Sequence, residues 1–68
     1  MNHIPRNFKS ITATALAGNV KGRRFRITKD ERGYHAQDLD TGEVWQALVS
    51  HLRNEAFFRL DLIEVEKN

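Results

Sequence analysis

The chain has 68 residues, no cysteine and a formal net charge of +2, and Leu, Ile, Val and Phe account for 18 of its residues. This composition allows one small globular domain and excludes a disulfide framework, a thiolate metal site and a fully disordered chain. A domain of this size buries only about 60% of its unfolded surface, so a homodimer or docking on a partner would bury more apolar surface, and of the two we expect self-association.

The charge is divided unevenly along the chain. Residues 1–34 hold eight basic and two acidic side chains, whereas residues 35–68 hold three basic and seven acidic ones. The basic half predicts an anionic partner, and the acidic half opposes indiscriminate binding to one. No stretch approaches the roughly 18 apolar residues of a membrane span, and the apolar run 11–17 is short for a signal peptide. We therefore expect a cytoplasmic protein without a membrane partner.

The N-terminal part contains an arm and an ambiguous segment. Residues 1–8 include Pro5 and Asn7 and are typical of a flexible arm, which leaves residues 9–68 as the single small domain. Residues 10–17 mix β-branched residues with Ala and Leu, so both a strand and a helix are open there. We favour a strand, which Gly18 would end.

Residues 24–37 have the pattern of a β-hairpin. Apolar side chains alternate with polar ones on both sides of a turn at Lys29–Gly33, and Gly33 can adopt the positive φ that a short loop needs. One face of the hairpin would carry Phe25, Ile27, Tyr34 and Ala36, and the other Arg24, Arg26, His35 and Gln37. The pattern thus places the basic side chains on one side.

The next segment indicates a helix. Asp40 and Glu43 have the spacing of a capping box, and at 100° per residue Val44, Trp45, Leu48 and Leu52 gather on one arc. The arc breaks after Arg53 or Asn54, so the predicted helix ends there. Trp45 is expected at the centre of the core.

Residues 57–66 alternate again and predict a strand, with a slip near Leu62–Ile63 that indicates a β-bulge. The predicted fold is therefore α+β. It consists of a small antiparallel sheet of three to four strands with one helix on its apolar face, in the order β-β-β-α-β, and the first strand is the least certain.

The basic face is the candidate site. Guanidinium groups on one strand face can bind phosphates, with a histidine and a glutamine beside them as further donors. The alternative is a solvated sheet face, which any small domain needs. The candidate binding residues are Lys21, Arg23, Arg24, Arg26, His35 and Gln37.

The sequence gives little support for a catalytic or metal-binding site. Residues 38–43 lack the ligand spacing of a calcium loop, and the Asp40–Gly42 tripeptide is a frequent short motif that a turn explains. Ser50 and His51 are adjacent and would point about 100° apart on a helix. We therefore expect no enzyme activity, no cofactor and no metal.

The function that these features favour is a small regulatory binding protein, of a kind typical of bacterial or bacteriophage accessory proteins. The first hypothesis is nucleic-acid binding through the basic hairpin face. The alternative is a protein partner, bound by the same face or by strand addition at an exposed sheet edge.

Overall fold

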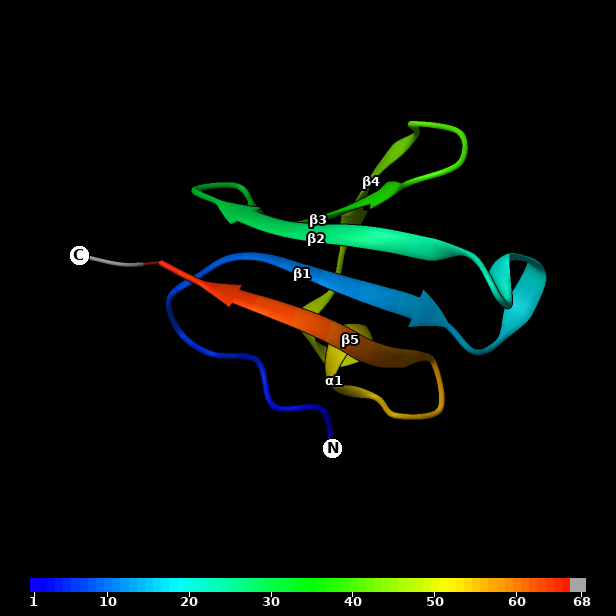
Figure 1. Cartoon of the computed structure of the whole chain (residues 1–68), viewed down its shortest axis with the longest axis horizontal. Helices are drawn as coiled ribbons and strands as arrows, with labels where there is room; N and C mark the ends of the chain where they lie inside the picture. Colours follow the sequence, from blue (N-terminus) through cyan, green and yellow to red (C-terminus); the bar gives the residue numbers. More distant parts are fainter. Residues whose placement is uncertain (67–68) are drawn as a thin grey trace.

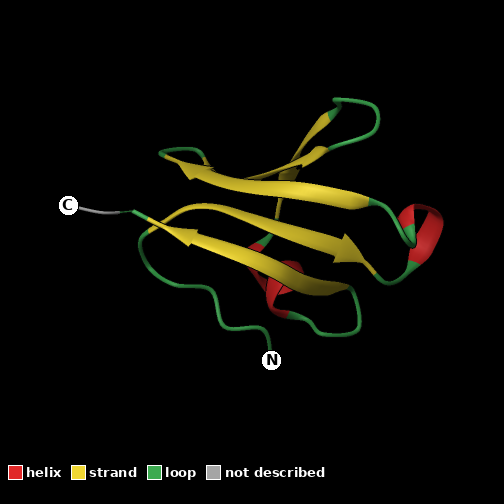
Figure 2. Ribbon diagram, in the orientation of Figure 1, coloured by secondary structure: helices red, strands yellow, loops and turns green. Residues whose placement is uncertain are grey.

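The computed structural model describes residues 1–66, which form one five-stranded antiparallel sheet in the order β4-β3-β2-β1-β5 (Figures 1 and 2). The strands are β1 (Phe8–Ala15), β2 (Arg24–Asp30), β3 (Gly33–Asp38), β4 (Val44–Ala47) and β5 (Phe58–Val65). A short 3₁₀ helix, η1 (Gly18–Val20), joins β1 to β2, and helix α1 (Val49–Arg53) joins β4 to β5.

Strands β1 to β4 follow one another as a meander, and α1 then returns the chain so that β5 pairs with β1. Figure 1 shows the strong twist of the sheet, with β4 running steeply to β1, β2 and β5. The two edges of the sheet are therefore β4 and β5.

The core lies on one face of this sheet and is completed by α1 and the N-terminal arm. Alternate residues of β1, Ile11, Ala13 and Ala15, are buried, as the strand period requires. The other buried apolar residues are Ile4, Phe8, Phe25, Ile27, Ala36 and Leu52. The favoured strand over residues 10–17 is thus confirmed, with bounds two residues earlier at each end.

The predicted hairpin is also confirmed. Strands β2 and β3 pair from Phe25 opposite Asp38 to Asp30 opposite Gly33, and Gly33 has φ +115°. Phe25, Ile27 and Ala36 are buried, and Tyr34 is half-buried against the core.

The helix predicted to begin after Asp40 and to end at Arg53 or Asn54 is only partly correct. Residues 44–47 form β4, which pairs with β3, and only residues 49–53 are helical. The capping box is wrong, because Asp40 and Glu43 lie in the turn between β3 and β4 and the α1 N-cap is Leu48. Pairing with β3 satisfies backbone N–H and C=O groups of residues 44–47 by hydrogen bonds of a β-ladder, whereas a short isolated helix is only marginally stable in water. The end of the helix at Arg53 is confirmed.

The α+β class and the antiparallel sheet are confirmed, but the predicted strand count and order are wrong. The sheet has five strands, and the element order is β-β-β-β-α-β once β4 is included. The strand over residues 57–66 is confirmed as β5. Its bulge lies at Asp61, one residue before the predicted slip, because Thr12 pairs with Leu62 whereas Ala13 pairs with Leu60.

Trp45 does not lie at the centre of the core. Its side chain is 40% exposed, packs on the Phe25 ring with 5.5 Å between centroids, and donates from Nε1 to Glu43 Oε2 at 2.7 Å. The fully buried residue from this part of the chain is Leu52 on α1. The segment 44–52 therefore covers the core through Leu52, with Trp45 at the rim.

The N-terminal arm lies against α1 and the start of β5. The Asn2 amide donates to the Arg53 carbonyl at 2.8 Å, and its side-chain Nδ2 donates to the Leu52 and Phe58 carbonyls at 3.1 and 2.7 Å. Ile4 is buried in the core. Within residues 1–66 no helix has the length and apolar character needed to cross a membrane.

Leu52→Ala should lower the free energy of unfolding by about 2–5 kcal/mol, because it leaves a cavity in a fully buried site. Trp45→Ala should cost less, since part of the indole already faces solvent. Denaturant unfolding followed by circular dichroism measures both, with the exposed Leu48→Ala as a control within about 0.5 kcal/mol of wild type. A Trp45→Ala loss as large as that of Leu52→Ala would contradict this placement.

Candidate nucleic-acid interface

The face of the sheet opposite the core, the outer face, carries two exposed arginines on β2. Arg26 lies between Gln37 of β3 and Thr12 of β1, and Arg24 lies beside Thr14 of β1. Both follow from the strand alternation, which buries Phe25 and Ile27 and so turns Arg24 and Arg26 outward. The two guanidinium groups are therefore flanked by hydroxyl and amide side chains, the donor types that contact phosphates beside arginine.

Arg24 and Arg26 have no ion-pair partner within residues 1–66. Asp61 of β5 lies on the same face as these arginines. Its pKa is lowered below the ordinary value by the Thr14 hydroxyl, which donates to Asp61 Oδ2 at 2.6 Å, and further by Arg59 and Arg24. Arg59 itself is bound to Asp61, with 2.9 Å between Nε and Oδ1. The Asp61 carboxylate thus interacts mainly with Arg59 of β5 and Thr14 of β1. Of the two arginines on β2, Arg26 lies farther from Asp61 along the strand.

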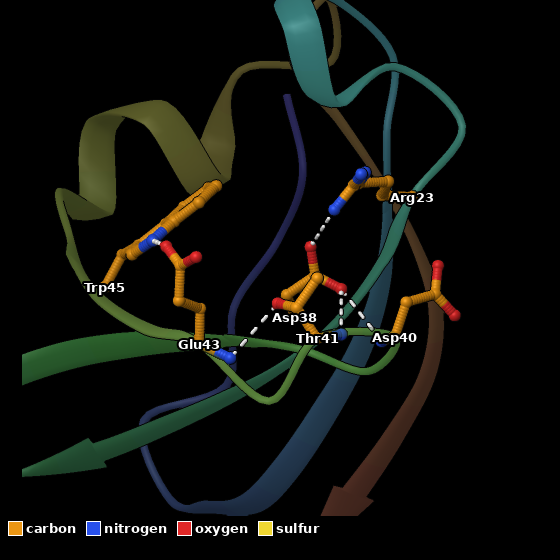
Figure 3. Close-up of polar contacts among 6 residues, drawn as sticks. All are labelled: Arg23, Asp38, Asp40, Thr41, Glu43 and Trp45. Atoms are coloured by element: carbon orange, nitrogen blue, oxygen red, sulfur yellow. Dashed lines mark hydrogen bonds and ion pairs between the residues drawn. The ribbon is translucent and has the colours of Figure 1, made fainter.

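Arg23 is placed differently from Arg24 and Arg26. Figure 3 shows Arg23 pointing at the carboxylate of Asp38. Its Nη1 lies 2.9 Å from Oδ2 of Asp38, whose side chain is 1% exposed. The same carboxylate accepts from the amides of Asp40 and Thr41 through Oδ1, at 2.8 and 3.2 Å. Arg23 is therefore bound to a buried acid that organises the β3–β4 turn.

Asp38 is the charged residue that sequence reasoning missed. The hydrogen bond from Arg23, followed by the one from the Asp40 amide, holds the pKa of Asp38 below its ordinary value. Its register position opposite Phe25 places it on the core side of the sheet. The sequence signal for this burial is the alternation of residues along β3, because it places Asp38 on the same face as the buried Ala36.

His35 and Gln37 lie on the outer face beside β2, as predicted, but each has an intramolecular contact. His35 Nε2 is 3.1 Å from Asp30 Oδ1, and Gln37 Nε2 donates to the Gly42 carbonyl at 3.3 Å. Lys21 is exposed and lies outside the sheet, in the turn that follows η1. The structure thus brings together Arg24, Arg26, His35 and Gln37, and it separates Lys21 and Arg23 from them.

Three further residues of the outer face were not predicted as site residues. Thr12 and Thr14 come from β1, and Arg59 comes from β5, opposite Thr14. The alternation in residues 10–15 signals that the threonines share a face, but their position beside Arg24 and Arg26 depends on β1 pairing with β2. Within residues 1–66 no group of three or more His, Asp or Glu side chains has the arrangement of a metal site.

Comparison with known proteins gives no match, since no protein-family model, no curated protein and no solved structure matches this chain. The functional interpretation therefore rests on the outer face and on the sheet edges.

Asp38→Asn should lower the stability of the fold at neutral pH, because it removes the charge that Arg23 pairs with but keeps an acceptor for the two turn amides. The folded-state pKa of Asp38 lies below its ordinary value of 3.8. The stability from its charge is therefore fully present above pH 3.8 and lost as the pH falls through the lower folded value. The stability difference between wild type and Asp38→Asn should shrink over that range.

Unfolding of both proteins measured between pH 7 and pH 2 tests this expectation. Asp30 and Asp61 also have lowered pKa values, but they titrate in both proteins and cancel in the difference. A difference that stays constant with pH would contradict a charged, paired Asp38.

Proposed function

We propose that this protein is a non-enzymatic binding protein that acts in the cytoplasm and holds the phosphate backbone of a nucleic acid on its outer face. The observation that carries the proposal is the pair Arg24 and Arg26. Both are exposed on β2, the middle strand of the sheet, neither is ion-paired within residues 1–66, and both lie beside hydroxyl or amide donors.

The chemistry of this face favours phosphate over base recognition. Guanidinium groups bind phosphate oxygens in a bidentate manner, and threonine and glutamine side chains add single hydrogen bonds. Phe25 and Tyr34 of β2 and β3 pack on the core side, so the outer face of these strands offers no phenyl or phenol ring for base stacking, and His35 at its edge carries the one ring there. The expected binding is therefore sensitive to salt and tolerant of sequence.

Arg23 supports the same arginines indirectly. It keeps the β3–β4 turn in place through Asp38, and β3 in turn carries Gln37 opposite Arg26. Among the predicted binding residues, we assign direct contact to Arg24, Arg26 and Gln37, with His35 at the edge of the face. Lys21 and Arg23 are assigned no direct contact.

The second candidate is a protein partner that adds a strand at the edge of the sheet. It is favoured by β5, an eight-residue edge strand with exposed Leu62 and Val65. Edge pairing uses backbone hydrogen bonds and apolar contacts, so it should respond little to salt. The salt dependence therefore separates the two candidates.

The double variant Arg24→Glu/Arg26→Glu should lower the affinity for a labelled single-stranded oligonucleotide at least about tenfold. The slope of log K against log salt should become shallower by about 1.4, because two phosphate contacts are lost. Fluorescence anisotropy at several salt concentrations measures both quantities.

The matched control is Arg32→Glu/Arg53→Glu, which changes the net charge by the same amount at a turn and on α1, away from the outer face. It should retain most of the affinity. Equal losses in the two double variants would show a response to net charge alone, and unchanged binding by a folded Arg24→Glu/Arg26→Glu would overturn the proposal.

A further inference from the structure

The sheet has one long open edge within the described residues. Strand β4 ends the sheet with only four residues, whereas β5 ends it with eight. Short edge strands resist pairing with other chains, and long ones invite it. Leu62 is 58% exposed on this edge, and Ile63 and Val65 are exposed as well.

The outward backbone of β5 is unpaired along most of its length. Within residues 1–66, hydrogen bonds of this backbone other than those to β1 occur only at its start. There the Phe58 amide donates to the Asn54 carbonyl at 3.1 Å, and Asn2 Nδ2 donates to the Phe58 carbonyl at 2.7 Å. From Arg59 to Val65 no further backbone bond is formed within residues 1–66. This stretch presents N–H and C=O groups that a further strand would satisfy.

The bulge determines which side chains of β5 share a face. Pairing with β1 places Phe58, Leu60, Ile63 and Val65 on the core side. Because Asp61 is the extra residue, Asp61 and Leu62 both lie on the outer face, together with Arg59 and Glu64. A regular strand would place neighbours such as Asp61 and Leu62 on opposite faces.

We propose that β5 pairs antiparallel with β5 of a second copy of this chain, about a two-fold axis between Asp61 and Leu62. In this register the opposed pairs are Arg59 with Glu64, Leu60 with Ile63, and Asp61 with Leu62. Each pair lies on a single face, as directly opposite residues of a ladder must. The core-side pair of Leu60 with Ile63 is apolar, and Arg59 of each copy faces Glu64 of the other.

The register is specific because of the bulge. A shift of one residue places core-side residues opposite outer ones, for example Leu60 opposite Leu62. A shift of two residues toward the C-terminus places Asp61 opposite Glu64, two like charges. Charge complementarity and the bulge therefore select the same pairing, and the occupant that fits it is a second copy.

The dimer would join the two sheets into one of ten strands with both outer faces on the same side. The two β2 strands would be separated by five strand spacings, about 24 Å, so the pair Arg24 and Arg26 would occur twice on one surface. The dimer does not depend on nucleic-acid binding, and each can fail without the other.

Sedimentation equilibrium of the purified chain without nucleic acid, from about 10 µM to about 1 mM, tests the dimer directly. The expected result is a shift from the 7.9 kDa monomer to a species of twice that mass. Glu64→Arg should weaken dimerisation at least about tenfold, because it creates two like-charge pairs per dimer. Arg59→Glu should do the same, and the double variant Arg59→Glu/Glu64→Arg should restore the affinity.

The control Glu31→Arg changes the charge as Glu64→Arg does, but in the β2–β3 turn, and it should dimerise like wild type. Arg59 also binds Asp61 within the monomer, so thermal melts must show that each variant folds, and Glu64→Arg tests the pairing without disturbing that bond. A monomer at all concentrations would overturn the proposal. So would a dimer that Glu64→Arg leaves intact, or a loss that the double variant does not restore.

Discussion

The structure depends on the burial of one carboxylate. Asp38 is almost fully removed from solvent, which is costly for a charged group unless it is paired and hydrogen-bonded. Arg23 and the amides of Asp40 and Thr41 supply those partners. The turn that they hold directs the chain into β4, so that α1 can cross to the opposite edge and place β5 beside β1.

The same interaction divides the basic residues of the chain. Arg23 is bound to Asp38 at the end of β2, whereas Arg24 and Arg26 project from the outer face of that strand. The uneven charge of the two halves of the sequence is thus partly balanced within the fold by the pair of Arg23 with Asp38. The positive charge that remains unpaired on the outer face is centred on β2, between the threonines of β1 and Gln37 of β3.

Local alternation predicted much of the fold. It gave the β2–β3 hairpin and the strand β5 with a bulge displaced by one residue, and the break in the helical arc gave the end of α1 at Arg53. It failed at residues 44–47, where the same apolar positions fit a helix or a strand, and where the choice depends on pairing with β3 and on the distant Asp38 turn. Trp45 was misplaced for the same reason, because a strand sends its side chain to the rim of the core.

The candidate site was predictable to a similar extent. The sharing of one face by Arg24, Arg26, His35 and Gln37 followed from the alternation. Arg23 was predicted as a binding residue, although its odd position puts it in step with Phe25 rather than with Arg24 and Arg26. The neighbours Thr12, Thr14 and Arg59 required the pairings of β1, which bring together segments far apart in the sequence. Such pairings have no local signature.

The most direct test of the outer face as a binding surface is nuclear magnetic resonance of the ¹⁵N-labelled chain during titration with a short single-stranded oligonucleotide. Shifts of the amide signals should concentrate on Thr12, Arg24, Arg26 and Gln37, and the signals of Leu48, His51 and Phe57 should stay in place. Shifts centred on those three residues instead, or none at saturating oligonucleotide in low salt, would contradict a phosphate-binding outer face.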